Sequence, residues 1–245
     1  MFEMGAEASA VKAILFDLYG TLIDIRTDEY DASVYEVLSR YLAYHAVSIA
    51  PEEMRKAFFE GVRQHLNESK EVHPEVDVYK VFFTIMNRYG KKRSAKSVVI
   101  DVATLFRTLT MRQFRVFDGV YDALVEVSAR WKTGIISDAQ WLFAEPEMSI
   151  LGLDQFFAVR VLSSRFGFKK PDPRLFRIAT DQLGVSPEDC VYVGDNPCKD
   201  LSGAKRVGMK FLLFNAERRE YNGYVPDRCF FSFRELKGVL SELSS

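Results

Sequence analysis

Hydrophobic residues follow two different patterns along this chain. From about residue 28 to about residue 114 they recur every three or four positions, with almost no strand pattern, which predicts a block of helices. From residue 117 onward, short apolar runs alternate with helical patterns, as in a parallel sheet with crossover helices. One more apolar run, at residues 13–15, precedes the helical block. The patterns therefore predict an α/β domain that a helical insertion interrupts after the first strand.

The helical block divides into four predicted helices. The first has its apolar residues at helical spacing within 34–42, and Pro51 begins the second, because proline is tolerated in the first turn of a helix. Pro74 begins the third helix, Gly90 ends it, and the fourth runs from about Ser94. Contacts among these helices are local in sequence, so the insertion should have an apolar core of its own.

The rest of the chain predicts an α/β fold with an open, doubly wound and mostly parallel sheet. We expect strands at residues 133–137, 158–162, 190–195 and 210–214, a last short strand near 229–231, and then a closing helix. The predicted organisation is a core of residues 11–25 and 115–245, a helical insertion of residues 26–114, and an N-terminal extension of residues 1–10. Sites in such sheets lie at the carboxyl ends of the strands, so functional residues should follow the strands directly.

Composition and charge exclude several classes of protein. The 245 residues carry a net charge of −1, and the shares of hydrophobic residues (48%) and charged residues (27%) are ordinary for a globular protein. We therefore expect neither a nucleic acid nor a membrane as a partner. Cys190, Cys198 and Cys229 are odd in number and lack metal-ligand spacing, which indicates reduced thiols in a cytoplasmic protein. The chain start lacks the basic region of a signal peptide, and no pattern indicates an oligomeric state.

Two polar residues stand at the ends of predicted strands. Asp17 follows the apolar run at 13–15, and Gly20 ends that strand. A carboxylate there could attack an electrophilic centre and form a covalent intermediate, or it could only cap the turn. Ser137 ends the strand predicted at 133–137. Its hydroxyl could hydrogen-bond an anion or cap a helix beginning at Asp138.

A lysine and two further acids complete the candidate chemistry. Lys170 precedes Pro171 and Pro173, which restrict the backbone, so its ammonium group could offset negative charge at a site; a solvated loop lysine is the alternative. Asp195 follows a predicted strand, and Asp200 lies five residues later. Paired carboxylates of this kind suit a magnesium ion, although they could also be surface acids at a helix start.

As a set, these motifs resemble those of the haloacid dehalogenase-like (HAD) superfamily of hydrolases with a type-1 helical cap. The matching stretches are FDLYGTL at 16–22, Ser137, GFKKPDP at 167–173 and VGDNPCKD at 193–200. They come in the order that the superfamily requires, and the resemblance covers nearly the whole chain. The resemblance implies a Rossmann-like core with the helical block inserted as a cap.

The resemblance also implies a role for each motif residue. Asp17 would be the nucleophile, Ser137 would donate a hydrogen bond to the phosphoryl group, and Lys170 would steady Asp17 and offset the substrate's charge. A magnesium ion would be held by Asp17, the backbone carbonyl of Tyr19, Asp195 and Asp200. Substrate contacts are expected from Gly20, Thr21, Asp138 and Arg26, although Arg26 is more simply a surface residue.

Tyr19 departs from the pattern of the superfamily's phosphatases, which have an aspartate there as general acid and base. Tyrosine has an unperturbed pKa of about 10, so it is a poor base at neutral pH. Tyr-Gly-Thr resembles the 2-haloacid dehalogenases, which use no metal, but those enzymes have Ser in place of Asp195 and Tyr in place of Phe176. Asp17 beside Asp195 would be costly without a cation, and magnesium would remove that cost.

Three functions follow from this mixture of motifs. The first is a magnesium-dependent phosphatase that acts on a small phosphorylated metabolite through an aspartyl-phosphate intermediate. The second is a hydrolase like the 2-haloacid dehalogenases, which attacks carbon. The third is a protein that binds a phosphorylated ligand without turnover. Metal dependence separates the first from the second, and turnover separates both from the third.

Overall fold

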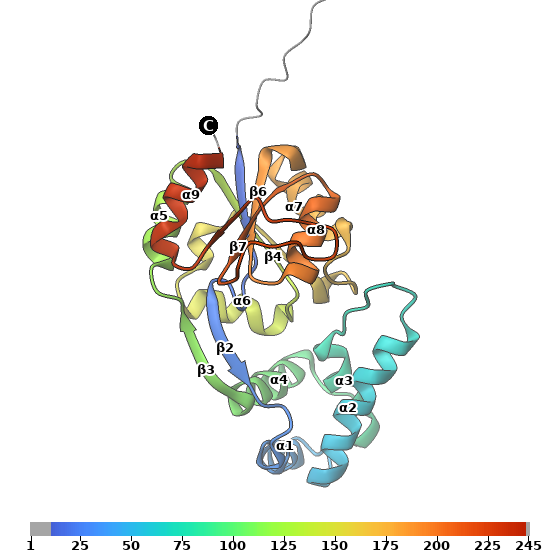
Figure 1. Ribbon diagram of the computed structural model, residues 1–245. Helices are drawn as coiled ribbons and strands as arrows, with labels where there is room; N and C mark the ends of the chain where they lie inside the picture. Colours follow the sequence, from blue (N-terminus) through green and yellow to red (C-terminus); the bar gives the residue numbers. More distant parts are fainter. Residues whose placement is uncertain (1–10, 244–245) are drawn as a thin grey trace, which may run out of the picture.

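The computed structural model describes residues 11–243, so the predicted extension at residues 1–10 lies outside the described residues (Figure 1). The fold is built on a six-stranded sheet of order β5-β4-β1-β6-β7-β8, in which every neighbouring pair is parallel. Its strands are β1 (Ala13–Phe16), β4 (Lys132–Ser137), β5 (Val159–Leu162), β6 (Cys190–Gly194), β7 (Lys210–Phe214) and β8 (Arg228–Phe230). Each predicted strand is confirmed to within one residue at its ends.

Helices cover both faces of this sheet, as the doubly wound prediction requires (Figure 1). Alternate residues of β1 point to opposite faces: Ile14 and Phe16 join the apolar cluster of one face, while Ala13 and Leu15 join that of the other. The helices of the first face are α5 (Val120–Ser128), α6 (Trp141–Ile150) and α9 (Leu236–Leu243). Those of the second face are α7 (Pro173–Leu183) and α8 (Ser202–Arg206).

Short helical turns connect several of these elements. They are the 3-10 turns η1 (Asp154–Phe156), η2 (Ser163–Arg165), η3 (Pro187–Asp189) and η5 (Phe233–Glu235), and the π-helical turn η4 (Pro197–Leu201). Within residues 11–243, none of the helices combines the length and the apolar character that crossing a membrane would demand.

The helical insertion hangs from the carboxyl end of β1 on a two-stranded ribbon (Figure 1). The antiparallel strands β2 (Ile23–Thr27) and β3 (Met111–Val116) form this ribbon. Beyond it lie α1 (Ala32–Tyr44), α2 (Pro51–Glu68), α3 (Val78–Tyr89) and α4 (Lys96–Thr110), which we call the cap. The cap has its own apolar cluster, and Leu142 and Phe143 of α6 extend that cluster into the core. The cap is therefore packed against the core and not only tethered to it.

The structure corrects two expectations for the helical block. Residues 111–114 were included in the helical pattern, but they belong to β3, because pairing with β2 outweighs their weak local preference. Pro74 does not begin the third helix, which starts at Val78 with Asp77 as its N-cap. Pro74 instead forms a β-bridge with Phe168 of the core. The start at Pro51 and the end at Gly90 are confirmed.

Candidate active site

Three parallel strands bring the predicted polar residues to one edge of the sheet. β1 lies between β4 and β6, with Phe16 level with both Ile135 and Val193. The backbone N–H of Asp17 donates to the carbonyl of Val193 at 2.9 Å, so Asp17 continues this register past the strand end. Ser137 ends β4 in the same way and is buried. The carboxyl edge of the sheet is therefore the candidate active site.

Asp17, Asp195 and Asp200 form an acid cluster at this edge. Each of them offers a carboxylate oxygen, and these three oxygens lie within 4.8 Å of one another. Burial and the neighbouring charge of Asp17 raise the pKa of Asp195. Burial also raises the pKa of Asp200, to about 7, against the opposing effect of Lys170. These acids would repel one another when ionised, and a bound cation would relieve that repulsion.

The turn after β1 contacts the carboxylate of Asp195. Gly20 has a φ of +85°, and a Cβ added to it would lie 2.6 Å from Oδ2 of Asp195, so a side chain would not fit. The hydroxyl of Thr21 is buried and donates to Oδ1 of Asp195 at 3.1 Å. The structure thus places both residues against the acid cluster, which they help to arrange.

Lys170 is the buried counter-ion of the acid cluster. Its Nζ lies 2.9 Å from Oδ1 of Asp17 and 2.6 Å from Oδ1 of Asp200, and it donates to the hydroxyl of Tyr192 at 3.1 Å. The side chain is only 2% exposed. Burial opposes its charge, but the surrounding carboxylates prevail and raise the pKa of the ammonium group. Lys170 therefore stays positively charged between Asp17 and Asp200.

The acid cluster has the chemistry of a hard-cation site. Oδ1 of Asp17 forms an ion pair with Lys170, yet that approach is not aligned as a hydrogen bond, and this buried oxygen accepts none from the described residues. Asp200 is more fully engaged, because its Oδ2 also accepts the backbone N–H of Asn196 at 2.9 Å. Asp17 and Asp195 could thus offer oxygens directly to an ion, whereas Asp200 could act through Lys170 or a water molecule.

Asp138 lies beside Ser137 and joins the cluster to the next loop. Its Oδ1 accepts the backbone N–H of Lys170 at 2.8 Å, which fixes the loop that carries the lysine. Its Oδ2 lies 3.2 Å from Nζ of Lys199. Helix α6 begins only at Trp141, so Ser137 is not its N-cap and the hydroxyl at the end of β4 is left for another role.

The side chain of Tyr19 is directed to a carboxylate of helix α6. Its hydroxyl donates to Oε2 of Glu147 at 2.5 Å, and the same carboxylate pairs with Arg107 of the cap helix α4 at 2.6 Å. The guanidinium carbon of Arg107 lies 5.4 Å from the centre of the Tyr19 ring. Burial and the charge of Glu147 raise the pKa of the Tyr19 phenol far above its usual range. Tyr19 therefore holds its proton and joins cap to core.

Arg26 is not brought to this site. It lies on β2, opposite Gln113 of β3, is exposed, and donates to the side-chain oxygen of Gln113. It is not among the residues that line the cavity between cap and core. The structure therefore places Arg26 at the surface, which was one of the two positions considered for it.

A cavity of about 460 Å³ opens between the cap and the carboxyl edge. Six aromatic side chains and four charged side chains contribute to its lining. Beyond Tyr19, the aromatic residues are Tyr30, Phe58, Phe59 and Phe106, together with Phe143, which lies on α6 of the core. The charged residues are Glu29, Glu75, Arg107 and Asp138. We call this space the cap cavity. Tyr19 and Asp138 in its lining place it beside the carboxyl edge of the sheet.

The haloacid dehalogenase-like hydrolase family matches residues 11–208 of the chain. The chain belongs to this family. Its helical cap lies between the first two strands of the core sheet, and its acid cluster and Lys170 lie at the carboxyl edge of that sheet.

Two relatives of known activity align with nearly the whole chain. A glyceraldehyde 3-phosphate phosphatase from Methanopyrus kandleri is 27% identical over 242 residues, which cover 96% of this chain and 99% of the relative. A phosphoglycolate phosphatase from Colwellia psychrerythraea is 25% identical over 231 residues, which cover 92% of this chain and 95% of the relative.

Solved structures of this family share the fold. A 2-haloacid dehalogenase from Pseudomonas syringae pv. Tomato DC3000 superposes with a TM-score of 0.70 at 23% identity, covering 95% of this chain and 99% of that one. The HAD-hydrolase YfnB from Bacillus subtilis, bound to magnesium, gives a TM-score of 0.56 at 18% identity, covering 95% and 99%. Both likenesses concern the fold.

Sequence analysis missed three polar residues that lie at the boundary between the cap and the core. Arg107, Glu147 and Glu75 each meet a partner from the other side of the cap–core boundary. A signal did exist for Glu147, because it stands at an apolar position of α6, at helical spacing from Phe143 and Ala144. A charged residue on the apolar face of a helix indicates a buried partner. Arg107 and Glu75 carry no comparable signal.

Proposed function

We propose that this protein is a magnesium-dependent phosphatase of small phosphorylated metabolites, acting through an aspartyl-phosphate on Asp17. The observation that carries the proposal is the buried acid cluster with Lys170 at the carboxyl edge. Asp195 carries most of this argument, because a second carboxylate beside Asp17 repels it when both are ionised, and a bound cation would remove that repulsion. The activities of the two relatives, both phosphatases of small phosphate esters, support the same conclusion.

Magnesium fits the residues present. Asp17, Asp195 and the backbone carbonyl of Tyr19 would hold it, with Asp200 acting through water, and when bound it would supply positive charge to the acids and to the phosphoryl oxygens. The magnesium-bound structure of YfnB supports this choice of ion. Isothermal titration with magnesium should show one site in the wild type.

The chain's own residues would perform two displacements at phosphorus. A carboxylate oxygen of Asp17 forms a bond to phosphorus while the bond to the ester oxygen breaks, and the departing alcohol takes a proton from water. A water oxygen then attacks the same phosphorus, the bond to Asp17 breaks, and phosphate leaves while the proton of the water passes to solvent. Ser137 would donate a hydrogen bond to the phosphoryl group, and Lys170 would keep Asp17 oriented and balance charge throughout.

Tyr19 makes the second displacement the slow one. Its phenol keeps its proton and directs it to Glu147, so it cannot serve as a base that activates water. We therefore expect the aspartyl-phosphate to accumulate. Rapid-quench kinetics with p-nitrophenyl phosphate should show a burst of nitrophenol equal to the enzyme concentration. Tyr19→Asp should raise the steady-state rate with this ester, provided that the variant still binds magnesium.

Dehalogenation is the second candidate, and the Tyr-Gly-Thr stretch at 19–21 favours it. An enzyme of that kind would attack the carbon that bears the halogen with Asp17 and would need no metal. Incubation with 2-chloropropionate in the presence of a chelator tests it directly. Chloride release under those conditions, without hydrolysis of p-nitrophenyl phosphate in magnesium, would replace the phosphatase proposal by this one. Failure of both reactions at high enzyme concentration would leave a ligand-binding protein.

A further inference from the structure

The cap cavity differs from the acid cluster and Lys170 beneath it in how its one cation, Arg107, is paired. We propose that it selects phosphate monoesters whose alcohol part carries no second negative charge, that is, esters of neutral or cationic alcohols. Esters that also bear a carboxylate would be turned away. This inference rests on the proposed phosphatase function and adds the substrate class to it.

The first support is the state of Arg107, the one cation among the described residues that line the cap cavity. Its Nε donates to Oε1 of Glu147 at 2.6 Å and its Nη2 to Oε2 at 3.2 Å, a bidentate pair. The side chains of Arg107 and Glu147 are only 14% and 6% exposed. The rings of Tyr19 and Phe143 lie 5.4 and 5.1 Å from the guanidinium carbon. Its charge is therefore already neutralised before a substrate enters.

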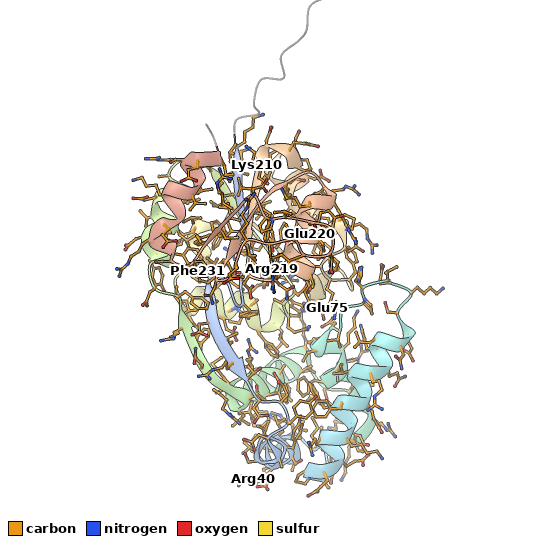
Figure 2. All side chains as sticks on the ribbon, in the orientation of Figure 1. Arg40, Glu75, Lys210, Arg219, Glu220 and Phe231 are labelled. Carbon is orange, nitrogen blue, oxygen red and sulfur yellow. The ribbon has the colours of Figure 1, made fainter. Side chains whose placement is uncertain are left out.

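The second support is that the other charged residues of the lining are acids. Asp138 is balanced by Lys199, but Glu29 and Glu75 have no such cation at ion-pair distance among the described residues. Figure 2 labels Glu75 at the boundary between the cap and the core. There it accepts the hydroxyl of Ser163 at 2.7 Å and the backbone N–H of Val76 at 2.9 Å. An anionic group in the cavity would face these carboxylates, and the one cation among the described lining residues, Arg107, is already paired.

The third support is the aromatic character of the lining. Tyr30 and Phe59 stack with ring centres 4.9 Å apart. The ring of Phe58 contacts the rings of both Phe59 and Phe106 within the apolar cluster of the cap. The faces of aromatic rings are electronegative, so they attract cations and apolar groups and offer nothing to an anion. Removal of a carboxylate from water into such a lining, without a partner, is costly.

The test compares esters that differ in one charged group. The pairs are phosphoethanolamine with phosphoglycolate, and glycerol 3-phosphate with 3-phosphoglycerate. In each pair the sizes are similar and only the second ester has a carboxylate. We expect kcat/KM to favour the first member by at least about tenfold in magnesium. Equal or better use of the carboxylated ester, by an enzyme that hydrolyses p-nitrophenyl phosphate, would overturn the inference and leave the proposed function standing.

A binding measurement separates the inference from the proposed chemistry. Calorimetric titration of the Asp17→Asn variant with the same four esters reports affinity where no covalent step can occur. The neutral or cationic ester should again bind at least about tenfold more tightly than its carboxylated counterpart. If this preference holds and the wild type hydrolyses nothing, the phosphatase proposal fails while the ligand class stands. A preference for the carboxylated esters contradicts the ligand class.

Two substitutions address the cause of the selectivity. Glu147→Gln leaves an acceptor for Tyr19 but frees the charge of Arg107, so the discrimination against carboxylated esters should fall several-fold. Glu145→Gln is the matched control, because it removes a carboxylate of the same helix that pairs at the surface with Arg165. It should leave the ratio unchanged. Glu29→Gln removes an acid from the lining without disturbing the pair of Arg107 and Glu147. It should lower the ratio of kcat/KM between the two esters of a pair, but by less than Glu147→Gln does. Unchanged ratios in both Glu147→Gln and Glu29→Gln would refute the assignment.

Discussion

The carboxyl edge of the sheet and the cap cavity meet at the same place but are built in opposite ways. At the edge, Lys170 lies among carboxylates and stays charged, because three strands and a proline-bounded loop hold every partner in place. In the cavity, the cation Arg107 is cancelled by Glu147, and rings and acids make up much of the lining. The first region is arranged to receive a doubly charged phosphoryl group. The second is arranged to receive something uncharged or positive.

This difference shows that two regions with similar residue types can favour ligand groups of different charge. Both regions contain one cation and several acids, so a count of charges does not distinguish them. What distinguishes them is pairing: Lys170 is shared among several carboxylates that can turn to a metal, whereas Arg107 is held bidentately by one carboxylate. The predictions below disturb one region or the other.

The largest effect is expected from removal of the cation at the carboxyl edge. Lys170→Met should abolish phosphatase activity and lower the free energy of unfolding by about 3–5 kcal/mol, because it leaves buried acids without their counter-ion. Steady-state rates and urea denaturation measure the two losses. Lys169→Met is the control, because Lys169 is adjacent but forms no ion pair with the acid cluster. A stable, active Lys170→Met protein would contradict the proposed role.

Asp195→Asn should separate metal binding from stability. In titrations, magnesium binding should weaken at least about tenfold, because one of the direct oxygen donors loses its charge. Without magnesium the variant should be more stable than the wild type at neutral pH, since folding raises the pKa of Asp195 and an acid with a raised pKa costs stability once it is ionised. Asp122→Asn, an exposed substitution on α5, should change neither quantity. Unaltered magnesium binding by Asp195→Asn would sink the metal assignment.

Tyr19→Phe tests the network that joins the two regions. The phenol donates to a buried carboxylate, so loss of the hydroxyl should cost about 1.5–3 kcal/mol in the free energy of unfolding. The size of the nitrophenol burst should not change, because that hydroxyl serves Glu147 and not Asp17. A variant that is as stable as the wild type but loses the burst would instead place the hydroxyl in the chemistry.

The smallest effect is expected at the surface of the cap–core boundary. Glu71 pairs there with Arg174, but both side chains are substantially exposed (34% and 46%). Glu71→Gln should therefore change the free energy of unfolding by less than about 1 kcal/mol and leave the ester selectivity as it is. A large change in either quantity would mean that surface pairs, and not the buried Glu147 pair, govern the boundary.

The contrast between the two regions also explains how far the sequence could lead. Asp17, Ser137 and Asp195 were predictable because each follows a short apolar run directly, and parallel strands deliver such residues to a common edge. The pair of Arg107 and Glu147 was not, because it joins residues 40 positions apart on helices of different structural units. Local periodicity describes which face of a helix is buried, but not which face of another helix it meets.

Two local errors have the same origin. Residues 111–116 are half-exposed and follow a helix without a break, so only their pairing with β2 reveals a strand. Pro74 fits the first turn of a helix as well as an extended segment, and its bridge to Phe168 decides between them. In both cases a distant partner overrides an ambiguous local preference.

The bridge between Pro74 and Phe168 attaches the cap to the loop that carries Lys170. The backbone N–H of Lys169 donates to the carbonyl of His73 at 2.9 Å, and that of Glu75 donates to the carbonyl of Gly167 at 3.0 Å. These bonds attach the cap to the very loop whose next residue is Lys170. Any movement that lifts the cap from this loop must break these hydrogen bonds, one of which lies next in sequence to Lys170, the counter-ion of Asp17. Opening of the cap would therefore disturb the loop that positions Lys170 between Asp17 and Asp200.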